Sequence, residues 1–194
     1  MRETATVLFN QDEIAARIRE IGQEVAREFA GKELCVVGLM KSCLLFMADL
    51  VRKIPMDLTC HFLEASSLRE QGAGSMRTAI VYSTEIPYEG RDILLLDDII
   101  DTGITLSFLL DHIRERRPRS LKVCALIDKP GDRKIDVHPD WAAFTLPEPL
   151  KDGRYIVGYG LDPEGYRGLP YLGTIPRPTP PVEGRKITIS GGGS

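Results

Sequence analysis

The sequence holds little of what a metal-thiolate site or a disulfide framework requires. Its 194 residues include four cysteines and three histidines, and no Cys-x-x-Cys pair or Cys/His cluster occurs. The cysteines are far apart, and three of them lie in or beside apolar segments; they are Cys35, Cys43, Cys60 and Cys124. We therefore expect reduced, mostly buried thiols rather than a zinc site or disulfide bonds.

The sequence also lacks a long hydrophobic run, an apolar leader at its start, and an excess of one charge. Lys and Arg number 25 against 28 Asp and Glu, for a formal net charge of −3. No membrane contact is expected, and a cytoplasmic location is the natural prediction. The slightly acidic balance argues against a nucleic-acid binder that depends on overall positive charge.

What the sequence does contain is enough apolar residue for a sizeable core. At 43% hydrophobic, the chain is predicted to form one globular domain rather than a disordered segment. We place this domain at residues 1–175. A proline-rich stretch begins at Pro176, and Ser190–Ser194 has the composition of an appended Gly/Ser linker, so residues 176–194 are predicted to be a tail outside the domain.

Short apolar segments alternate with helical patterns along the domain. Asn10 and Glu13 form a helix-opening pair, followed by apolar residues at helical spacing up to Gly31. Strands are predicted at Leu34–Leu39, Thr59–Leu63, Thr78–Tyr82, Ile93–Leu96 and Leu121–Ile127, and further helices at Leu44–Val51 and Thr105–Arg116. This order is typical of an α/β fold with a mostly parallel sheet flanked by helices. Ser66–Arg77, poor in apolar residues, is predicted to be a long flexible loop.

The segment Ile93–Leu106 is the most informative for function. An apolar strand leads to the paired acids Asp97 and Asp98, and a turn from Asp101 to Thr105 then opens a helix. Hydroxyls and backbone N–H groups at a helix start suit a phosphate. The adjacent carboxylates suit Mg²⁺ or the hydroxyls of a sugar. Any one of these acids could instead end a strand or cap a helix; three within so short a stretch repel one another unless cations or a ligand compensate.

This segment resembles the phosphoribosyl-pyrophosphate signature of type I phosphoribosyltransferases, in which an apolar strand, paired acids and an Asp-Thr-Gly-x-Thr turn follow in one register. Further stretches are similar to the bacterial hypoxanthine (guanine) phosphoribosyltransferases: Lys41–Leu50, Leu126–Pro130, Tyr155–Asp162 and Tyr166–Gly173. The resemblance implies the fold of that family, a twisted sheet with a small hood formed by terminal segments. It also implies transfer of a ribosyl 5-phosphate from phosphoribosyl pyrophosphate to a 6-oxopurine.

The resemblance assigns roles to individual residues. Asp101 matches the acid/base residue that accepts a proton from the purine. The 5′-phosphate turn comprises Asp101, Thr102, Gly103, Ile104 and Thr105. Asp97 and Asp98 match the residues at the ribose hydroxyls and their bound Mg²⁺, and Asp162 matches a second Mg²⁺ contact. Mg²⁺ is therefore the expected cofactor.

The remaining roles concern the base and pyrophosphate. Lys129 matches the lysine that donates to the purine 6-oxo group, and Tyr155 and Ile156 match the stacking aromatic and its neighbour at the ring edge. Arg167 matches a cation facing pyrophosphate. Lys41 and Ser42 match the first pyrophosphate loop, in which the family commonly has a cis peptide. Family members are commonly dimers or tetramers, so a homodimer or homotetramer is expected.

Three departures from the family pattern leave alternatives open. Ser42 stands where the family usually has glycine, Leu68 where it usually has tyrosine, and Glu148–Arg154 extends the connection before Tyr155. A transferase for another base, xanthine or a non-purine ring, is one alternative. The other is a non-catalytic regulator that senses phosphoribosyl pyrophosphate and binds a nucleic acid or a protein through basic residues at the end of the last predicted helix, Arg114, Arg116, Arg117 and Arg119. We favour the simpler interpretation that these cations complement a helix dipole.

Overall fold

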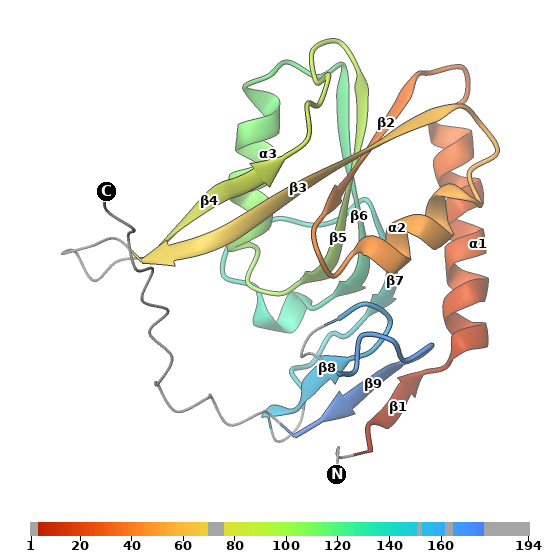
Figure 1. Cartoon of the computed structure of the whole chain (residues 1–194), viewed down its shortest axis with the longest axis vertical. Coiled ribbons are helices and arrows are strands. Elements are labelled where there is room, and N and C mark those ends of the chain that lie inside the picture. The colour runs from red at the N-terminus through yellow and green to blue at the C-terminus, as the bar shows by residue number, and fades with distance from the viewer. Residues whose placement is uncertain (1–3, 70–75, 151–152, 162–164, 177–194) are drawn as a thin grey trace, which may run out of the picture.

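The computed structural model describes residues 4–69, 76–150, 153–161 and 165–176. Their largest element is a six-stranded sheet of order β4-β3-β2-β5-β6-β7 (Figure 1). Its strands are β2 (Leu34–Leu39), β3 (Leu58–Arg69), β4 (Met76–Ser83), β5 (Asp92–Ile100), β6 (Ser120–Asp128) and β7 (Trp141–Thr145). The pairs are parallel except β3 with β4. The prediction of a mostly parallel sheet is confirmed.

Helices cover both faces of this sheet. One apolar cluster packs α1 (Gln11–Glu28) and α2 (Leu44–Val51) against one face, and a second packs α3 (Ile104–Arg114) against the other. The strands in the middle are buried on both sides: all six residues of β2 are buried. This explains why they are continuous apolar runs without alternation.

The first helix begins where the sequence predicts it. The Asn10 side-chain oxygen accepts from the backbone N–H groups of Asp12 and Glu13 at 2.9 and 3.0 Å, and the Glu13 carboxylate accepts from the Asn10 N–H at 2.7 Å. This reciprocal capping box satisfies N–H groups that have no partner within the helix. The prediction is confirmed.

A second, three-stranded sheet lies beyond the carboxyl ends of the parallel strands (Figure 1). It consists of β1 (Thr6–Phe9), β9 (Leu172–Ile175) and β8 (Tyr155–Val157), in the order β1-β9-β8, with antiparallel pairing. We call it the hood. Both ends of the domain contribute to it, as the family resemblance implies, and it places a small layer of structure over the sheet edge where ligands of α/β folds bind.

Two sequence predictions need correction. The stretch Ser66–Arg77 is not a loop throughout, because β3 continues to Arg69 and β4 begins at Met76, with seven antiparallel pairs joining them. In Figure 1 this hairpin projects past the rest of the sheet. A projecting hairpin has no core to cover at its end, so its backbone pairing forms without an apolar pattern. Residues 70–75 between the strands lie outside the described residues, as do residues 177–194 of the predicted tail.

The second correction concerns the paired acids. Asp97 and Asp98 do not follow the strand; they lie within β5, which continues to Ile100. Asp97 pairs with Ala125 of β6, so the ladder extends past the acids. Backbone pairing with β6 outweighs the low strand propensity of aspartate.

Candidate active site

The acids of β5 and the turn after them surround one cavity. Its volume is about 140 Å³, and its lining is Leu39, Asp97, Asp98, Ile99, Ile100, Asp101, Gly103, Thr105 and Leu106. Five of the predicted site residues are thus brought together at the carboxyl edge of the sheet. Thr102 and Ile104 belong to the same turn without lining this cavity.

The turn is held by its own side chains and by glycine. The Asp101 carboxylate accepts from the Thr102 N–H at 2.5 Å, and the Thr102 hydroxyl accepts from the Ile104 N–H at 3.4 Å. Gly103 caps α3 with a φ of 80°, a left-handed conformation that favours glycine. A turn in this conformation directs N–H groups at the helix start toward one point, which suits an anion.

Asp97 has an unusual electrostatic environment. It is 4% exposed, and its carboxylate accepts from the Asp98 N–H at 2.9 Å. Burial, and next the charge of Asp98, raise the pKa of the Asp97 carboxyl well above its ordinary value. Burial also raises the pKa of the nearby Cys43 thiol, with Asp98 and Asp97 contributing.

Two adjacent carboxylates, one of them buried, fit a hard cation. Mg²⁺ is commonly held by one or two carboxylates, with water and substrate oxygens completing its shell. Asp97 and Asp98 supply that donor type beside a small cavity. Asp162, the third predicted metal contact, lies outside the described residues.

The first loop lies next to these acids. The Met40–Lys41 peptide bond is cis, which matches what the family resemblance implies for this loop. On its other side the loop meets the segment before the last strand: a Cβ atom at Gly160 would lie 2.6 Å from the Ser42 carbonyl oxygen. An Arg167 guanidinium N–H donates to the Gly160 carbonyl at 3.4 Å. Lys41, Ser42 and Arg167 therefore belong to one part of the site.

Lys129 starts a tight turn after β6. Its backbone N–H donates to the Ile100 carbonyl at 2.9 Å, which ties the turn to the end of β5. Its ammonium forms an ion pair with Asp132, and its side chain is 18% exposed. Lys129 is therefore not an exposed loop lysine.

Tyr155 and Ile156 lie on β8 of the hood. Tyr155 is 44% exposed, so a large part of its surface is open, whereas Ile156 packs in the core. The connection before Tyr155 reaches the Lys129 turn, because a Cβ atom at Gly131 would lie 2.5 Å from the Pro147 carbonyl oxygen. Residues 151–152 of this connection lie outside the described residues.

Asp132 and Arg133 are not among the site residues predicted from the sequence. Asp132 pairs with Lys129, and Arg133 reaches both Asp128 and the carbonyl of Asp101. Charged residues in a Gly-Asp turn look like solvated loop residues, and only the recurrence of charge directly after the Asp-Lys-Pro stretch could have drawn attention to them.

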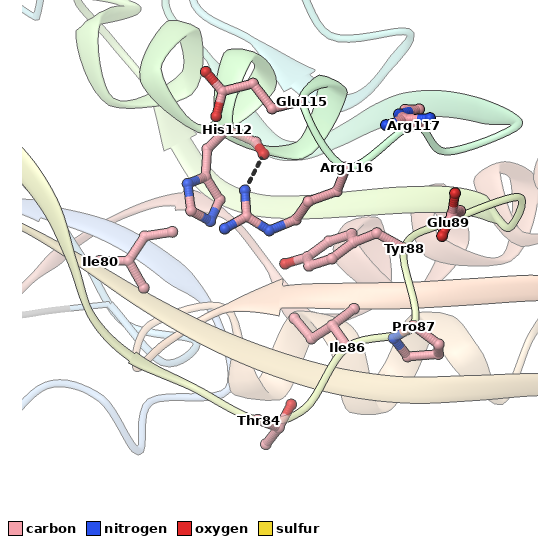
Figure 2. Close-up of a pocket in the computed structure, with 10 residues that line it drawn as sticks. All are labelled: Ile80, Thr84, Ile86, Pro87, Tyr88, Glu89, His112, Glu115, Arg116 and Arg117. Carbon is pink, nitrogen blue, oxygen red and sulfur yellow. Dashed lines mark hydrogen bonds between the residues drawn. The ribbon is translucent and has the colours of Figure 1, made fainter.

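A larger cavity, of about 700 Å³, lies elsewhere, between the segment before β5 and the end of α3 (Figure 2). Its walls include Tyr88, His112 and Arg116, and the Arg116 guanidinium lies over the Tyr88 ring, 5.8 Å from its centroid. An Arg116 N–H also donates to the His112 carbonyl at 2.5 Å. None of the predicted site residues lines this cavity, so size alone does not locate the site.

Known proteins match this chain over most of its length. The phosphoribosyl transferase domain family matches residues 5–164. Hypoxanthine-guanine phosphoribosyltransferase of Bacillus subtilis is 38% identical over 170 residues, which cover 87% of this chain and 92% of that protein. The bifunctional protein TilS/HprT of Listeria monocytogenes is also 38% identical over 170 residues, but the chain spans only 26% of its length.

Solved structures agree. A hypoxanthine-guanine phosphoribosyltransferase of Bacillus anthracis superposes with a TM-score of 0.81 at 33% identity, covering 89% of this chain and 99% of that one. A hypoxanthine phosphoribosyltransferase of Trypanosoma cruzi, solved as a ternary substrates complex, gives a TM-score of 0.81 at 28% identity, covering 91% of this chain and 98% of that one.

Proposed function

Because this chain belongs to the phosphoribosyltransferase family, we propose that it transfers the 5-phosphoribosyl group from phosphoribosyl pyrophosphate to a 6-oxopurine and releases pyrophosphate. Hypoxanthine is the proposed acceptor and guanine a second one, so the nucleotide products are IMP and GMP, as in purine salvage. One observation carries the proposal: the acid-and-turn cavity and the Lys129 turn are joined at the end of β5 by the Lys129 N–H to Ile100 hydrogen bond.

The turn from Asp101 to Thr105 would bind the 5′-phosphate. Its N–H groups stand at the start of α3, where the helix dipole also favours an anion. Asp97 and Asp98 would hold Mg²⁺ together with the ribose hydroxyls. When bound, the metal ion supplies positive charge that offsets the pyrophosphate oxygens.

Asp101 would accept the proton that the purine loses as the new glycosidic bond forms. Its carboxylate lines the cavity and is held by the Thr102 N–H, which fixes its direction. A carboxylate so placed is a suitable general base. Lys41, Ser42 and Arg167 would bind pyrophosphate, with the Arg fork matching phosphate oxygens.

The base would be selected by Lys129 and covered by Tyr155. An ammonium only donates hydrogen bonds, so it favours a 6-oxo group over the 6-amino group of adenine. Tyr155 presents an open ring on the hood, and apolar contact on a ring face is how aromatic residues bind bases.

A transferase for another base remains the second candidate. Pro147 packs directly against Gly131, two residues after Lys129, so the longer connection reaches the turn that would read the base. The non-catalytic regulator has less support, since three arginines of its basic run are already used. Arg114 pairs with Asp111, Arg116 donates to His112, and Arg119 pairs with Asp92. No nucleic-acid partner is proposed.

Location and assembly are part of the proposal. The four cysteines are unpaired, which supports a reducing compartment such as the cytoplasm. Within the described part of the chain, no helix has the length and apolar character to cross a membrane. A homodimer or homotetramer stays a prediction, to be checked by light scattering.

The test is a base panel. The purified protein is incubated with phosphoribosyl pyrophosphate and Mg²⁺, and pyrophosphate release is measured with hypoxanthine, guanine, xanthine, adenine and uracil. Release with hypoxanthine or guanine, stopped by a chelator and restored by Mg²⁺, is the expected result. Preference for xanthine or uracil would favour the second candidate, and no release with any base would exclude a transferase for these bases.

A further inference from the structure

Arg133 is a buried arginine outside the set of residues that touch the proposed substrates. Its side chain is 8% exposed, and it follows the short helical turn η1 (Pro130–Asp132). One guanidinium N–H donates to the carbonyl oxygen of Asp101 at 2.7 Å, and another donates to the carboxylate of Asp128. Arg133 thus bridges the phosphate turn and the last residue of β6.

The two residues that Arg133 contacts, Asp101 and Asp128, include or adjoin the two groups that would act on the base. Asp101 is the proposed proton acceptor, and Asp128 directly precedes Lys129. The same two segments are joined by backbone bonds around the arginine: Lys134 and Ile135 donate their N–H groups to the Thr102 carbonyl at 2.9 and 3.1 Å. The guanidinium therefore lies where the phosphate turn and the segment after β6 are held together by several hydrogen bonds.

Close packing leaves Arg133 little freedom. A Cβ atom at Gly103 would lie 3.1 Å from the Arg133 Cδ atom, so the arginine stem lies against the glycine of the phosphate turn. A planar guanidinium can serve two acceptors at fixed angles, which a flexible ammonium cannot. Any shift of Arg133 must then move the Asp101 carbonyl or the Asp128 carboxylate.

Arg133 and Lys129 have different carboxylate partners. Asp128 is 8% exposed and pairs with Arg133, whereas Lys129 pairs with Asp132. Without Arg133, the buried Asp128 carboxylate would be left without its cation, and the Lys129 ammonium next to it is the nearest replacement in sequence. That exchange would turn Lys129 away from the base.

Burying Arg133 also has an energetic cost. Its Nε atom is buried and has no hydrogen-bond partner among the described residues. An unsatisfied buried donor destabilises the folded state, and such groups are uncommon in native structures. Keeping arginine here is understandable if the two hydrogen bonds that it does form serve the site.

We propose that Arg133 is a positioning residue that sets where the Lys129 ammonium lies relative to the Asp101 carboxylate, and thereby maintains selection of 6-oxopurines. The proposal rests on the proposed function. It concerns the base half of the site, because the phosphate turn keeps its two backbone bonds from Lys134 and Ile135 without the guanidinium.

The test compares Arg133→Met with a matched control, Arg119→Met. Arg119 also pairs with a buried aspartate, Asp92, at 3.0 Å, but at the amino-terminal edge of the same sheet. Both variants remove the arginine from a buried carboxylate, although Asp92 also accepts from the Ser120 hydroxyl at 2.7 Å. kcat and KM are measured for hypoxanthine and adenine, KM for phosphoribosyl pyrophosphate, and thermal stability for each variant.

We expect Arg133→Met to lower kcat/KM for hypoxanthine by about 10- to 100-fold, the range for small misplacements in an active site. The hypoxanthine-to-adenine ratio should fall with it, while KM for phosphoribosyl pyrophosphate stays within about threefold. Arg119→Met should lower Tm without changing the ratio. If the ratio is unchanged in Arg133→Met, or falls equally in Arg119→Met, the role is only structural and the proposal is overturned.

Two further measurements keep the answer decisive. If Arg133→Met does not fold, Arg133→Lys replaces it, and a ratio within about twofold of the wild type overturns the proposal. If the wild type has no turnover, the proposed function fails, and calorimetric binding of inosine 5′-monophosphate and ribose 5-phosphate takes the place of kinetics. Arg133→Met should then weaken the first by about tenfold and leave the second unchanged; equal weakening of both would contradict the proposal.

Discussion

The Tyr159 hydroxyl donates a hydrogen bond to the carboxylate of Asp49 at 2.5 Å. Asp49 lies on α2, and Tyr159 follows β8, so this bond joins the helix layer to the segment that leaves the hood. Tyr159 is 6% exposed, and burial, with the Asp49 carboxylate next, raises the pKa of its hydroxyl. The Tyr159 hydroxyl therefore keeps its proton and donates it in the hydrogen bond to Asp49.

Tyr159→Phe should destabilise the protein by about 1–3 kcal/mol, because it removes one partner of a buried hydrogen bond to a charged group. The measurement is urea unfolding. Tyr88→Phe is the matched control: this ring is also buried, and no hydrogen bond of its hydroxyl occurs among the described residues. Equal loss in both variants would show that the Asp49 contact contributes nothing of its own.

Asp101→Asn should lower kcat by about 100- to 10,000-fold, the usual contribution of a general base. Asparagine has the same shape and keeps an oxygen that can accept from the Thr102 N–H. Binding of phosphoribosyl pyrophosphate, followed by calorimetry, should therefore change little. Wild-type kcat in this variant would remove Asp101 from proton transfer.

Lys129→Met should lower kcat/KM for hypoxanthine by about 10- to 150-fold, the equivalent of one lost hydrogen bond from a charged donor. Adenine has no 6-oxo group to accept from Lys129, so its low activity should stay nearly constant. Lys134→Met, in the same segment but exposed, is the control. A parallel decline for both bases in Lys129→Met would mean that the lysine does not read the 6-oxo group.

Gly103→Ala should damage the phosphate turn. A Cβ atom there would lie 2.7 Å from Val137 Cγ2 and 2.8 Å from the Ile135 carbonyl oxygen, at a φ of 80°. Gly31, with a φ of 73°, has nothing within 4 Å of its Cβ position, so Gly31→Ala isolates the backbone strain of about 1–2 kcal/mol. The excess loss in Gly103→Ala, about 1–3 kcal/mol, should be accompanied by a higher KM for phosphoribosyl pyrophosphate.

Thiol labelling should single out Cys60. It is the exposed member of the four cysteines, whereas Cys35, Cys43 and Cys124 are buried. A chromogenic disulfide reagent should label one thiol in the native protein and four after unfolding, and Cys60→Ser should abolish the native signal. Although the residue is exposed, partial burial of its thiol raises the pKa of Cys60. Less thiolate is therefore present at pH 8 than in a free thiol. The labelling rate should continue to increase above pH 9.

Sequence patterns correctly predicted the structural features that depend on residues close together in the chain. The capping pair Asn10 and Glu13, the buried strand Leu34–Leu39 and the turn at Gly103 each follow from a few consecutive residues, and all three are in the structure. Both strands of the β3–β4 hairpin were predicted, but their extension through residues 66–69 and 76–77 was missed, because few of these residues are apolar and strand pairing between such segments has no local signature.

The rest of the site depends on contacts between distant segments. Arg133 meets Asp101 across 32 positions of chain, and the approach of Gly160 to Ser42 joins even more distant residues. Hydrophobic periodicity carries no information about such pairs of polar groups. The family resemblance supplied the residues proposed to touch substrate, but it did not reveal the residues that hold them in place.

The pairing of β1 with β9 sets an order of assembly. Thr6 and Thr174 are partners in the hood although they lie near opposite ends of the described chain. During synthesis, at about 5–20 residues per second, the parallel sheet with its phosphate turn is complete well before Leu172 leaves the ribosome. The hood is therefore the last part to form, and a nascent or truncated chain that ends before β9 would have the phosphate turn and the Lys129 turn but no paired strand to hold Tyr155 in place.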